Sequence, residues 1–166
     1  MKLDKLTSFD TNKKYNQKLF VIDALNSLKD SAVQCSTKFI KFIDTNDNDK
    51  TNSDFQASMF NFNAFVEPLR DLIIVLAIKK DNQSLKTLGQ CIAYYKTNSL
   101  SSTKEVLLMA DFLFKRNELV HKYYNAIFLQ EEYLNFMSNY NKELIRLSED
   151  IYLIMKNEDL LREEIW

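Results

Sequence analysis

His121 is the one histidine among 166 residues, and it stands beside the side chains best suited to act on a phosphate ester. Arg116 lies five positions before it, and Tyr123 lies two positions after it. Histidine titrates near neutrality and therefore serves as a general acid or base. Arginine presents a planar fork of N–H donors to phosphate oxygens. This spacing indicates phosphate chemistry within two helical turns.

The same stretch predicts a helix with one polar and aromatic face. On a helical wheel, a sector of about 160° carries the side chains of Arg116, Asn117, His121, Tyr123 and Tyr124. Glu118 and Lys122 lie on the other side as an i,i+4 pair of favourable order. A face this polar needs hydrogen-bond partners when buried, so we expect it in a cleft or in a groove shared by two protomers. The alternative is a structural histidine at a helix end, with Arg116 paired to Glu118 or Asp111.

The arrangement of Arg116, four residues, His121, one residue and Tyr123 resembles the signature of HEPN domains of the HepT toxin type. Asn117, directly after the arginine, also fits that pattern. The resemblance implies a metal-independent endoribonuclease without a cofactor, acting as a homodimer in a toxin–antitoxin or phage-defence system. It assigns catalytic roles to Arg116 and His121, and supporting roles to Asn117 and Tyr123.

The resemblance also implies a partner. In HepT-like toxins a cognate nucleotidyltransferase antitoxin attaches AMP to the corresponding tyrosine and blocks the site. Tyr123 is therefore the expected modification position, and Tyr124 is the adjacent alternative.

Apart from the family resemblance, the chemistry of metal-free RNA cleavage itself states which side chains an active site needs. It needs a base for the 2′-OH proton, an acid for the leaving 5′ oxygen and a cation for the charge on the phosphorane. Because the chain has one histidine, two imidazoles can meet only across a two-fold axis. We therefore expect half of an active site per protomer, and products with a 2′,3′-cyclic phosphate and a free 5′-OH.

The composition predicts the scaffold that must position this motif. One glycine and one proline leave little material for tight turns or hairpins, which favours an all-α protein. A chain of 166 residues is most simply one domain. We expect a single HEPN-like helical domain over 1–166, built as an up-and-down bundle of four long helices plus one short helix.

Helical periodicity locates these helices. Apolar residues recur in alternating steps of four and three, which places one apolar stripe on each helix of a bundle. The segments are Val21 to Phe42, Phe55 to Leu76, 103–124 and Tyr133 to Ile154, with a shorter one from Leu85 to Tyr95. We expect the last long segment to be one continuous helix.

Details between the stripes add further expectations. The polar run 45–54 should be a loop that ends in N-capping residues at 52–54. Pro68 should kink the second helix near Glu67. Phe60, Phe62 and Phe65 are expected in the core, with a helix–helix dimer surface as the alternative. The acidic tail 157–166 is either a frayed helix end or a partner-binding peptide that carries Trp166.

Charge, cysteines and hydropathy exclude several classes. The formal net charge of -1 gives no global attraction to nucleic acid or anionic membranes. Cys35 and Cys91 have no paired spacing and are expected as reduced core residues of a cytoplasmic protein. One histidine and two distant cysteines exclude a His–Cys metal site. We expect no signal peptide and no membrane span, because the longest aliphatic run, Leu72 to Ile78, is too short.

Three functional hypotheses remain open from the sequence. The first is the RNA-cleaving HEPN dimer. The second is a non-catalytic HEPN-like module that docks a nucleotidyltransferase or a nucleic acid. The third is a structural bundle with an accidental motif, for which we expect a monomer with Arg116 pointing to solvent.

Overall fold

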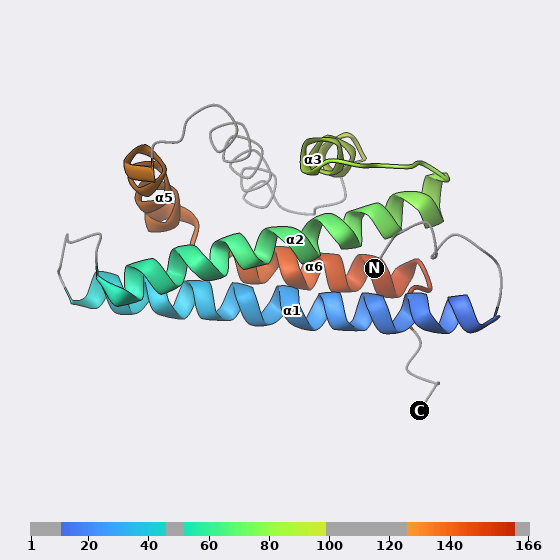
Figure 1. Ribbon diagram of the computed structural model, residues 1–166, viewed down its shortest axis with the longest axis horizontal. Coiled ribbons are helices and arrows are strands. Elements are labelled where there is room, and N and C mark those ends of the chain that lie inside the picture. The colour runs from blue at the N-terminus through green and yellow to red at the C-terminus, as the bar shows by residue number, and fades with distance from the viewer. Residues whose placement is uncertain (1–10, 46–51, 99–125, 162–166) are drawn as a thin grey trace.

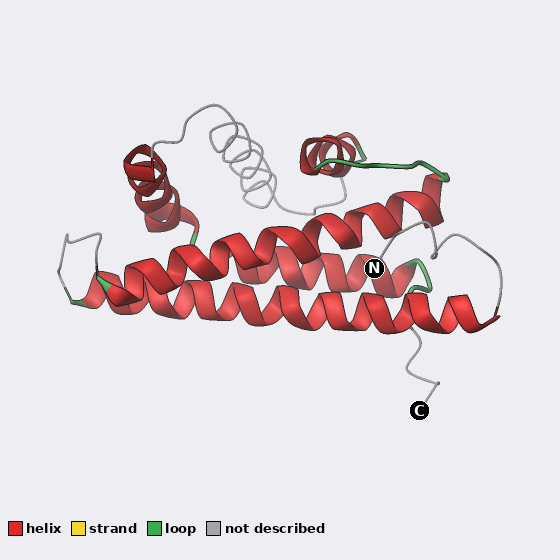
Figure 2. Ribbon diagram, viewed as in Figure 1, coloured by secondary structure: helices red, strands yellow, loops and turns green. Residues whose placement is uncertain are grey.

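The computed structural model describes residues 11–45, 52–98 and 126–161. Within these ranges every regular element is a helix and no strand is present (Figure 2). The elements are α1 (Thr11–Asp44), α2 (Ser53–Asp81), α3 (Leu88–Thr97), α5 (Ala126–Tyr140) and α6 (Glu143–Asn157). The predicted all-helical fold class is confirmed.

Three of these helices form a long bundle, and two lie across it (Figure 1). α1 and α2 pack side by side in opposite directions, and α6 packs against α1. α3 packs against the C-terminal half of α2 and is seen nearly end-on, as is α5 near the other end of the bundle. None of the helices in the described ranges is both long and apolar enough to cross a membrane.

The predicted stripes of the first two helices form the core. All seven stripe residues of α1, from Val21 to Phe42, are buried. The stripe of α2 is buried as well, apart from Met59, which is partly buried and packs against the core. Phe62 and Phe65 are core residues as expected, whereas Phe60 is 73% exposed. The four-and-three spacing therefore identified the face along which α1 and α2 meet.

The expectation of one continuous helix from Tyr133 to Ile154 is wrong. The segment forms two helices, α5 and α6, separated by a turn at Asn141 and Lys142. Near the end of α5, the side chains of Ser138 and Asn139 donate to main-chain carbonyls one turn back, a competition that weakens helices. The apolar residues keep their alternating steps of four and three on both sides of the turn, so the turn cannot be recognised from periodicity alone.

The second helix starts at its predicted cap. Asn52 is the N-cap of α2, and its Oδ1 accepts from the main-chain N–H groups of Asp54 at 2.8 Å and Phe55 at 3.4 Å. α2 continues as one helix through Pro68, which is buried. Proline has no N–H to donate to the carbonyl of Ala64.

Candidate functional site

The predicted site residues Arg116, Asn117, His121 and Tyr123, together with Tyr124, lie outside the described residues. The described helices that precede and follow them in the chain are α3, which ends at Thr97, and α5, which begins at Ala126. The contacts of α3 and α5 with α1 and α2 therefore fix where the described chain ends before the motif segment and where it resumes after it.

α3 is fixed to α2 by its buried face. Cys91, Ile92 and Tyr95 are buried, and the Tyr94 hydroxyl donates to Asp81 Oδ2 at 2.5 Å. Burial and the neighbouring Asp81 carboxylate raise the pKa of Tyr94, so it remains a protonated donor. A capping box between Thr87 and Gln90 begins the helix.

α5 is held by the aromatic ring of Tyr133. This ring packs edge-on against Phe39 of α1, with ring centroids 6.2 Å apart. It also packs against Phe55 at 5.7 Å and Phe62 at 5.4 Å, both from α2. Aromatic pairs in this geometry stabilise by about 0.5–1.5 kcal/mol each beyond their buried area, so the ring joins α5 to both long helices.

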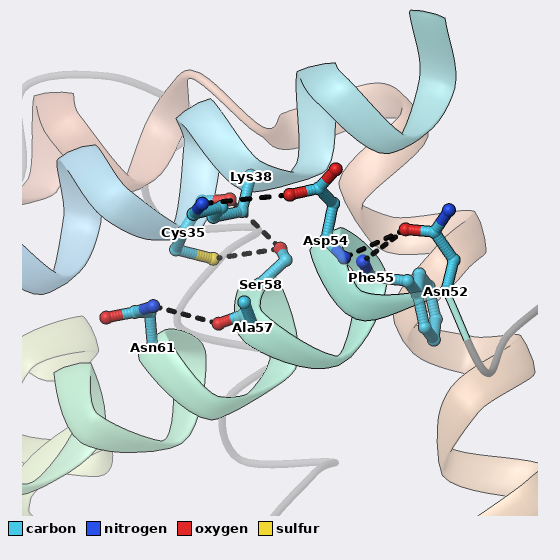
Figure 3. A network of polar contacts seen from close by, with 8 residues as sticks. All are labelled: Cys35, Lys38, Asn52, Asp54, Phe55, Ala57, Ser58 and Asn61. Atoms are coloured by element: carbon cyan, nitrogen blue, oxygen red, sulfur yellow. Dashed lines mark hydrogen bonds and ion pairs between the residues drawn. The ribbon is translucent and has the colours of Figure 1, made fainter. Parts of the chain in front are cut away.

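The hydroxyl of Tyr133 completes a closed hydrogen-bond network with Cys35 of α1 and Ser58 of α2. Ser58 Oγ donates to the Cys35 carbonyl at 2.9 Å, and Figure 3 shows this side of the network. Ser58 has one hydroxyl proton, so it accepts from the Tyr133 hydroxyl. Cys35 Sγ lies 3.2 Å from that hydroxyl and donates to it. Cys35 therefore takes part in the network twice: its thiol donates to Tyr133, and its main-chain carbonyl accepts from Ser58.

This network is suited to holding helices together and not to nucleophilic chemistry. All three side chains are buried. Burial raises the pKa of the Cys35 thiol, although its contacts with the hydroxyls of Tyr133 and Ser58 partly oppose this shift. Burial and the nearby Cys35 raise the pKa of Tyr133 as well. Both groups stay neutral at physiological pH, and a buried thiol without thiolate character is inert.

The N-terminal end of α2 is also tied to α1. Lys38 Nζ lies 3.7 Å from Asp54 Oδ1, next to the Asn52 cap (Figure 3). Asp54 lies in the first turn of α2, where a carboxylate is favoured by the helix dipole. The ion pair therefore links the first turn of α2, one turn before Ser58, to α1.

The cysteines confirm one expectation from the sequence. Cys35 and Cys91 are both free and buried. Burial raises the pKa of Cys91 to about 12, and its Sγ lies 3.8 Å from the Arg70 carbonyl. In the described ranges, no group of three or more His, Cys, Asp or Glu side chains is arranged to hold a metal ion.

Two grooves run along α1. The first, of about 540 Å³ between α1 and α2, is lined by four acidic residues: Asp23, Asp30, Glu67 and Asp71. Asp71 Oδ1 lies 3.6 Å from Arg70 Nη2. Burial raises the pKa of Asp71, against the opposing effect of that guanidinium. The second groove lies between α1 and α6, has a volume of about 490 Å³ and is mostly apolar.

The groove between α1 and α6 was not predicted from the sequence. On α1 the residues that line it beside the core stripe are Ile22, Asn26 and Lys29, each one position after a core residue.

No protein-family model matches this chain, and neither a curated protein nor a solved structure with significant similarity was found. The resemblance to HEPN domains therefore depends on the motif residues.

Proposed function

We propose that this protein is a metal-independent endoribonuclease of the HEPN/HepT type that acts in the cytoplasm as a homodimer. The observation that carries the proposal is the spacing of Arg116, His121 and Tyr123, with Asn117 after the arginine. The all-helical fold is compatible with it. The proposal places a further long helix over 103–124, in addition to the described helices α1, α2, α3, α5 and α6.

In the proposed reaction, the imidazole of one protomer's His121 removes the 2′-OH proton and the 2′ oxygen attacks the adjacent phosphorus. The second protomer's His121 protonates the 5′ oxygen as the P–O5′ bond breaks. Arg116 donates to the non-bridging oxygens, whose charge grows in the phosphorane. Asn117 orients the RNA backbone or His121. The products are a 2′,3′-cyclic phosphate and a 5′-OH.

Regulation by a cognate nucleotidyltransferase is part of the proposal. The nucleotidyltransferase transfers AMP from ATP to the hydroxyl of Tyr123, which loses its proton as pyrophosphate leaves. The added group is a bulky anion beside His121 and Arg116, and it blocks RNA by sterics and by charge repulsion. Co-expression with a nucleotidyltransferase encoded beside this chain should add AMP to the intact mass. That added mass should disappear in Tyr123→Phe, and it should persist in Tyr124→Phe.

Cleavage in EDTA tests the nuclease directly. Wild-type protein should degrade RNA into fragments with 5′-OH ends and cyclic phosphates. His121→Ala and Arg116→Ala should each lower the rate by about 100-fold or more, since general acid–base and electrostatic terms are of that size. Glu118→Gln is the matched control, because Glu118 lies on the other side of the predicted helix.

The outcomes separate the hypotheses. Full activity in a folded His121→Ala variant contradicts the catalytic assignment. A stable complex with a nucleotidyltransferase or with RNA, without cleavage products, supports the non-catalytic binding module instead. Circular dichroism of each variant must match wild type, because a loss of helix would remove activity for a trivial reason.

A further inference from the structure

The chain turns sharply where α6 ends. Asp159 directly follows the C-cap residue and has a left-handed backbone, with φ 55°. Its N–H donates to the Lys156 carbonyl at 3.2 Å, and the N–H of Leu160 donates to the Met155 carbonyl at 2.9 Å. This pair of bonds is the Schellman motif, which ends a helix at a left-handed residue. Because that conformation is unfavourable for a residue with a Cβ, the contacts made after the turn must hold it.

The two leucines after the turn make such contacts. Leu160 is 2% exposed, and Met155, its usual apolar partner in a Schellman motif, is fully buried. Leu161 is partly buried against the core and lines the groove between α1 and α6. The last described residue of the chain therefore lies in the α1–α6 groove, and residues 162–166 continue from there.

The walls of this groove are apolar on both sides. Ile22 and Leu25 come from α1, and Tyr152 and Leu153 come from α6. Tyr152 and Leu153 are both exposed. The volume of about 490 Å³ is large enough for bulky side chains. Since apolar surface is stabilised when it is removed from water, the groove favours an apolar occupant.

The residues that follow Leu161 have the composition of such an occupant. Residues 162–166 are Arg-Glu-Glu-Ile-Trp. Ile165 and Trp166 supply one aliphatic and one aromatic side chain, and an aromatic side chain buries about 150–250 Å² when it is covered. The segment therefore carries the apolar surface that the groove can take up.

The charges and the length of the segment also agree with the groove. α6 runs antiparallel to α1 (Figure 1), so a chain that returns from the end of α6 follows α1 from Ile22 towards Lys29. These two residues are separated by about 10 Å along the helix, a distance that an extended chain covers in about three residues. Glu163 and Glu164, two and three residues after Leu161, can thus reach Lys29, which lines the groove as an exposed side chain.

We propose that residues 162–166 fold back into the α1–α6 groove, where the two apolar residues cover its walls and the two glutamates lie beside Lys29. The partner of the groove is then this chain's own segment, which fastens α6 to α1. The inference goes beyond the nuclease proposal and does not rest on it, because it uses only the described helices and the sequence that follows them.

The fluorescence of Trp166, the single tryptophan, tests the proposal in the full chain. In wild type its emission should be blue-shifted from that of the urea-unfolded chain, and iodide should quench it poorly. Leu153→Glu places a carboxylate in the apolar wall, so emission should move to the unfolded position and quenching should rise several-fold, about 5-fold. Phe60→Glu is the matched control: Phe60 is more exposed than Leu153 and lies on α2 outside the groove, so neither signal should change.

A charge exchange tests the position of the two glutamates. Lys29→Glu should shift the ratio of docked to released segment by about 5-fold towards release. Combining it with Glu163→Lys and Glu164→Lys in the same chain should restore the protection of Trp166, because the opposite charges then face each other again. Lys86→Glu, an equally drastic change at an exposed lysine outside the groove, should have no effect.

Ile165→Glu changes the segment instead of the groove. It should release Trp166 as Leu153→Glu does, so a folding fault in the groove variant cannot decide the result alone. Circular dichroism of each variant should match wild type.

Three results overturn the proposal. The first is a wild-type Trp166 as accessible to iodide as in the unfolded chain. The second is a protected Trp166 that neither Leu153→Glu nor Ile165→Glu releases. The third is protection that is lost on dilution in step with a dissociating dimer, which would place the segment in the groove of a second copy. The fluorescence is measured without RNA, so an absence of RNA cleavage contradicts only the nuclease proposal.

Discussion

Two faces of α1 differ in how completely they are covered, although they are one residue apart in sequence. Phe39 belongs to the face that packs against α2 and α5 and is 1% exposed. Its neighbour Ile40 belongs to the open face and is 43% exposed. Both positions carry large apolar residues, so composition does not explain the difference. What differs is the presence of a neighbouring helix over the side chain.

The polar groups on the two faces follow the same division. On the covered face, Cys35 is buried in a closed network with Ser58 and Tyr133. On the open face, Lys29 and Glu149 line the α1–α6 groove as exposed side chains. Buried polar groups need hydrogen-bond partners within the protein, whereas exposed charged groups can be solvated by water. The polar groups of the covered face therefore help to specify the fold, and those of the open face need no partner within it.

The largest expected effect comes from truncating one side chain on each face. Phe39→Ala should destabilise the protein by about 3–5 kcal/mol, because it leaves a cavity and removes a ring contact with Tyr133. Ile40→Ala should change the free energy of unfolding of the monomer by less than about 0.5 kcal/mol. Urea denaturation at low protein concentration measures both. Equal destabilisation by the two variants would show that the faces do not differ as described.

The covered face could be predicted from the sequence because its stripes repeat at the period of a helix. The stripes from Val21 to Phe42 and from Phe55 to Leu76 are each confirmed by burial. The turn at Asn141 and Lys142 was missed because the apolar pattern continues through it. The side chains of Ser138 and Asn139 donate to carbonyls one turn back just before this turn, and such local bonds leave no mark on periodicity.

The polar network shows a second limit of sequence analysis. Cys35 was predicted as a buried thiol, but its partner Tyr133 is 98 positions away in the chain. Nothing in the spacing pairs them, because the contact depends on α5 crossing the bundle (Figure 1). The candidate catalytic group is the reverse case. Its residues are local in sequence, so the motif at Arg116 to Tyr123 could be recognised from spacing alone, and the expectation of a homodimer followed from the single histidine.

A smaller effect is expected from removing single hydroxyl groups. Tyr133→Phe keeps the ring packing but leaves Ser58 and the Cys35 thiol without their shared partner. This should cost about 1–3 kcal/mol, the penalty for unsatisfied buried polar groups. Tyr152→Phe removes the same atom from the exposed face of α6 and is the matched control, with an expected change within about 0.5 kcal/mol. Thermal melts with calorimetry would measure the pair.

A third variant, Ser58→Ala, shows which hydrogen bonds of the covered face contribute to stability. If Tyr133→Phe is neutral while Ser58→Ala is destabilising, the Ser58 bond to the Cys35 carbonyl holds the network without the tyrosine hydroxyl. If both variants are neutral, the covered face is held by apolar packing, and its polar groups contribute little.

The smallest change in stability is expected from a new thiol on the exposed face. The rate at which a reagent modifies that thiol and Cys35 measures directly how well each face is covered. Val33→Cys places a thiol two residues before Cys35 on the exposed side of the same helix, with an expected stability change within about 0.5 kcal/mol. Because burial raises the pKa of Cys35 and excludes reagent, a disulfide reagent at pH 8 should modify the new thiol at least about 100-fold faster.

The same raised pKa predicts a pH dependence with a definite sign. The folded state keeps the Cys35 proton above the pH at which the unfolded thiol, with its ordinary pKa near 9, releases it. The unfolded state then binds fewer protons, so stability is complete below that pH and falls as the pH rises above it. The melting temperature should decline above pH 9, and Cys35→Ala should decline less steeply from a lower starting value, whereas Val33→Cys should add no further slope. Rapid modification of Cys35 in the native protein, or parallel slopes for wild type and Cys35→Ala, would mean that water reaches the covered face and that the two sides of α1 differ only in degree.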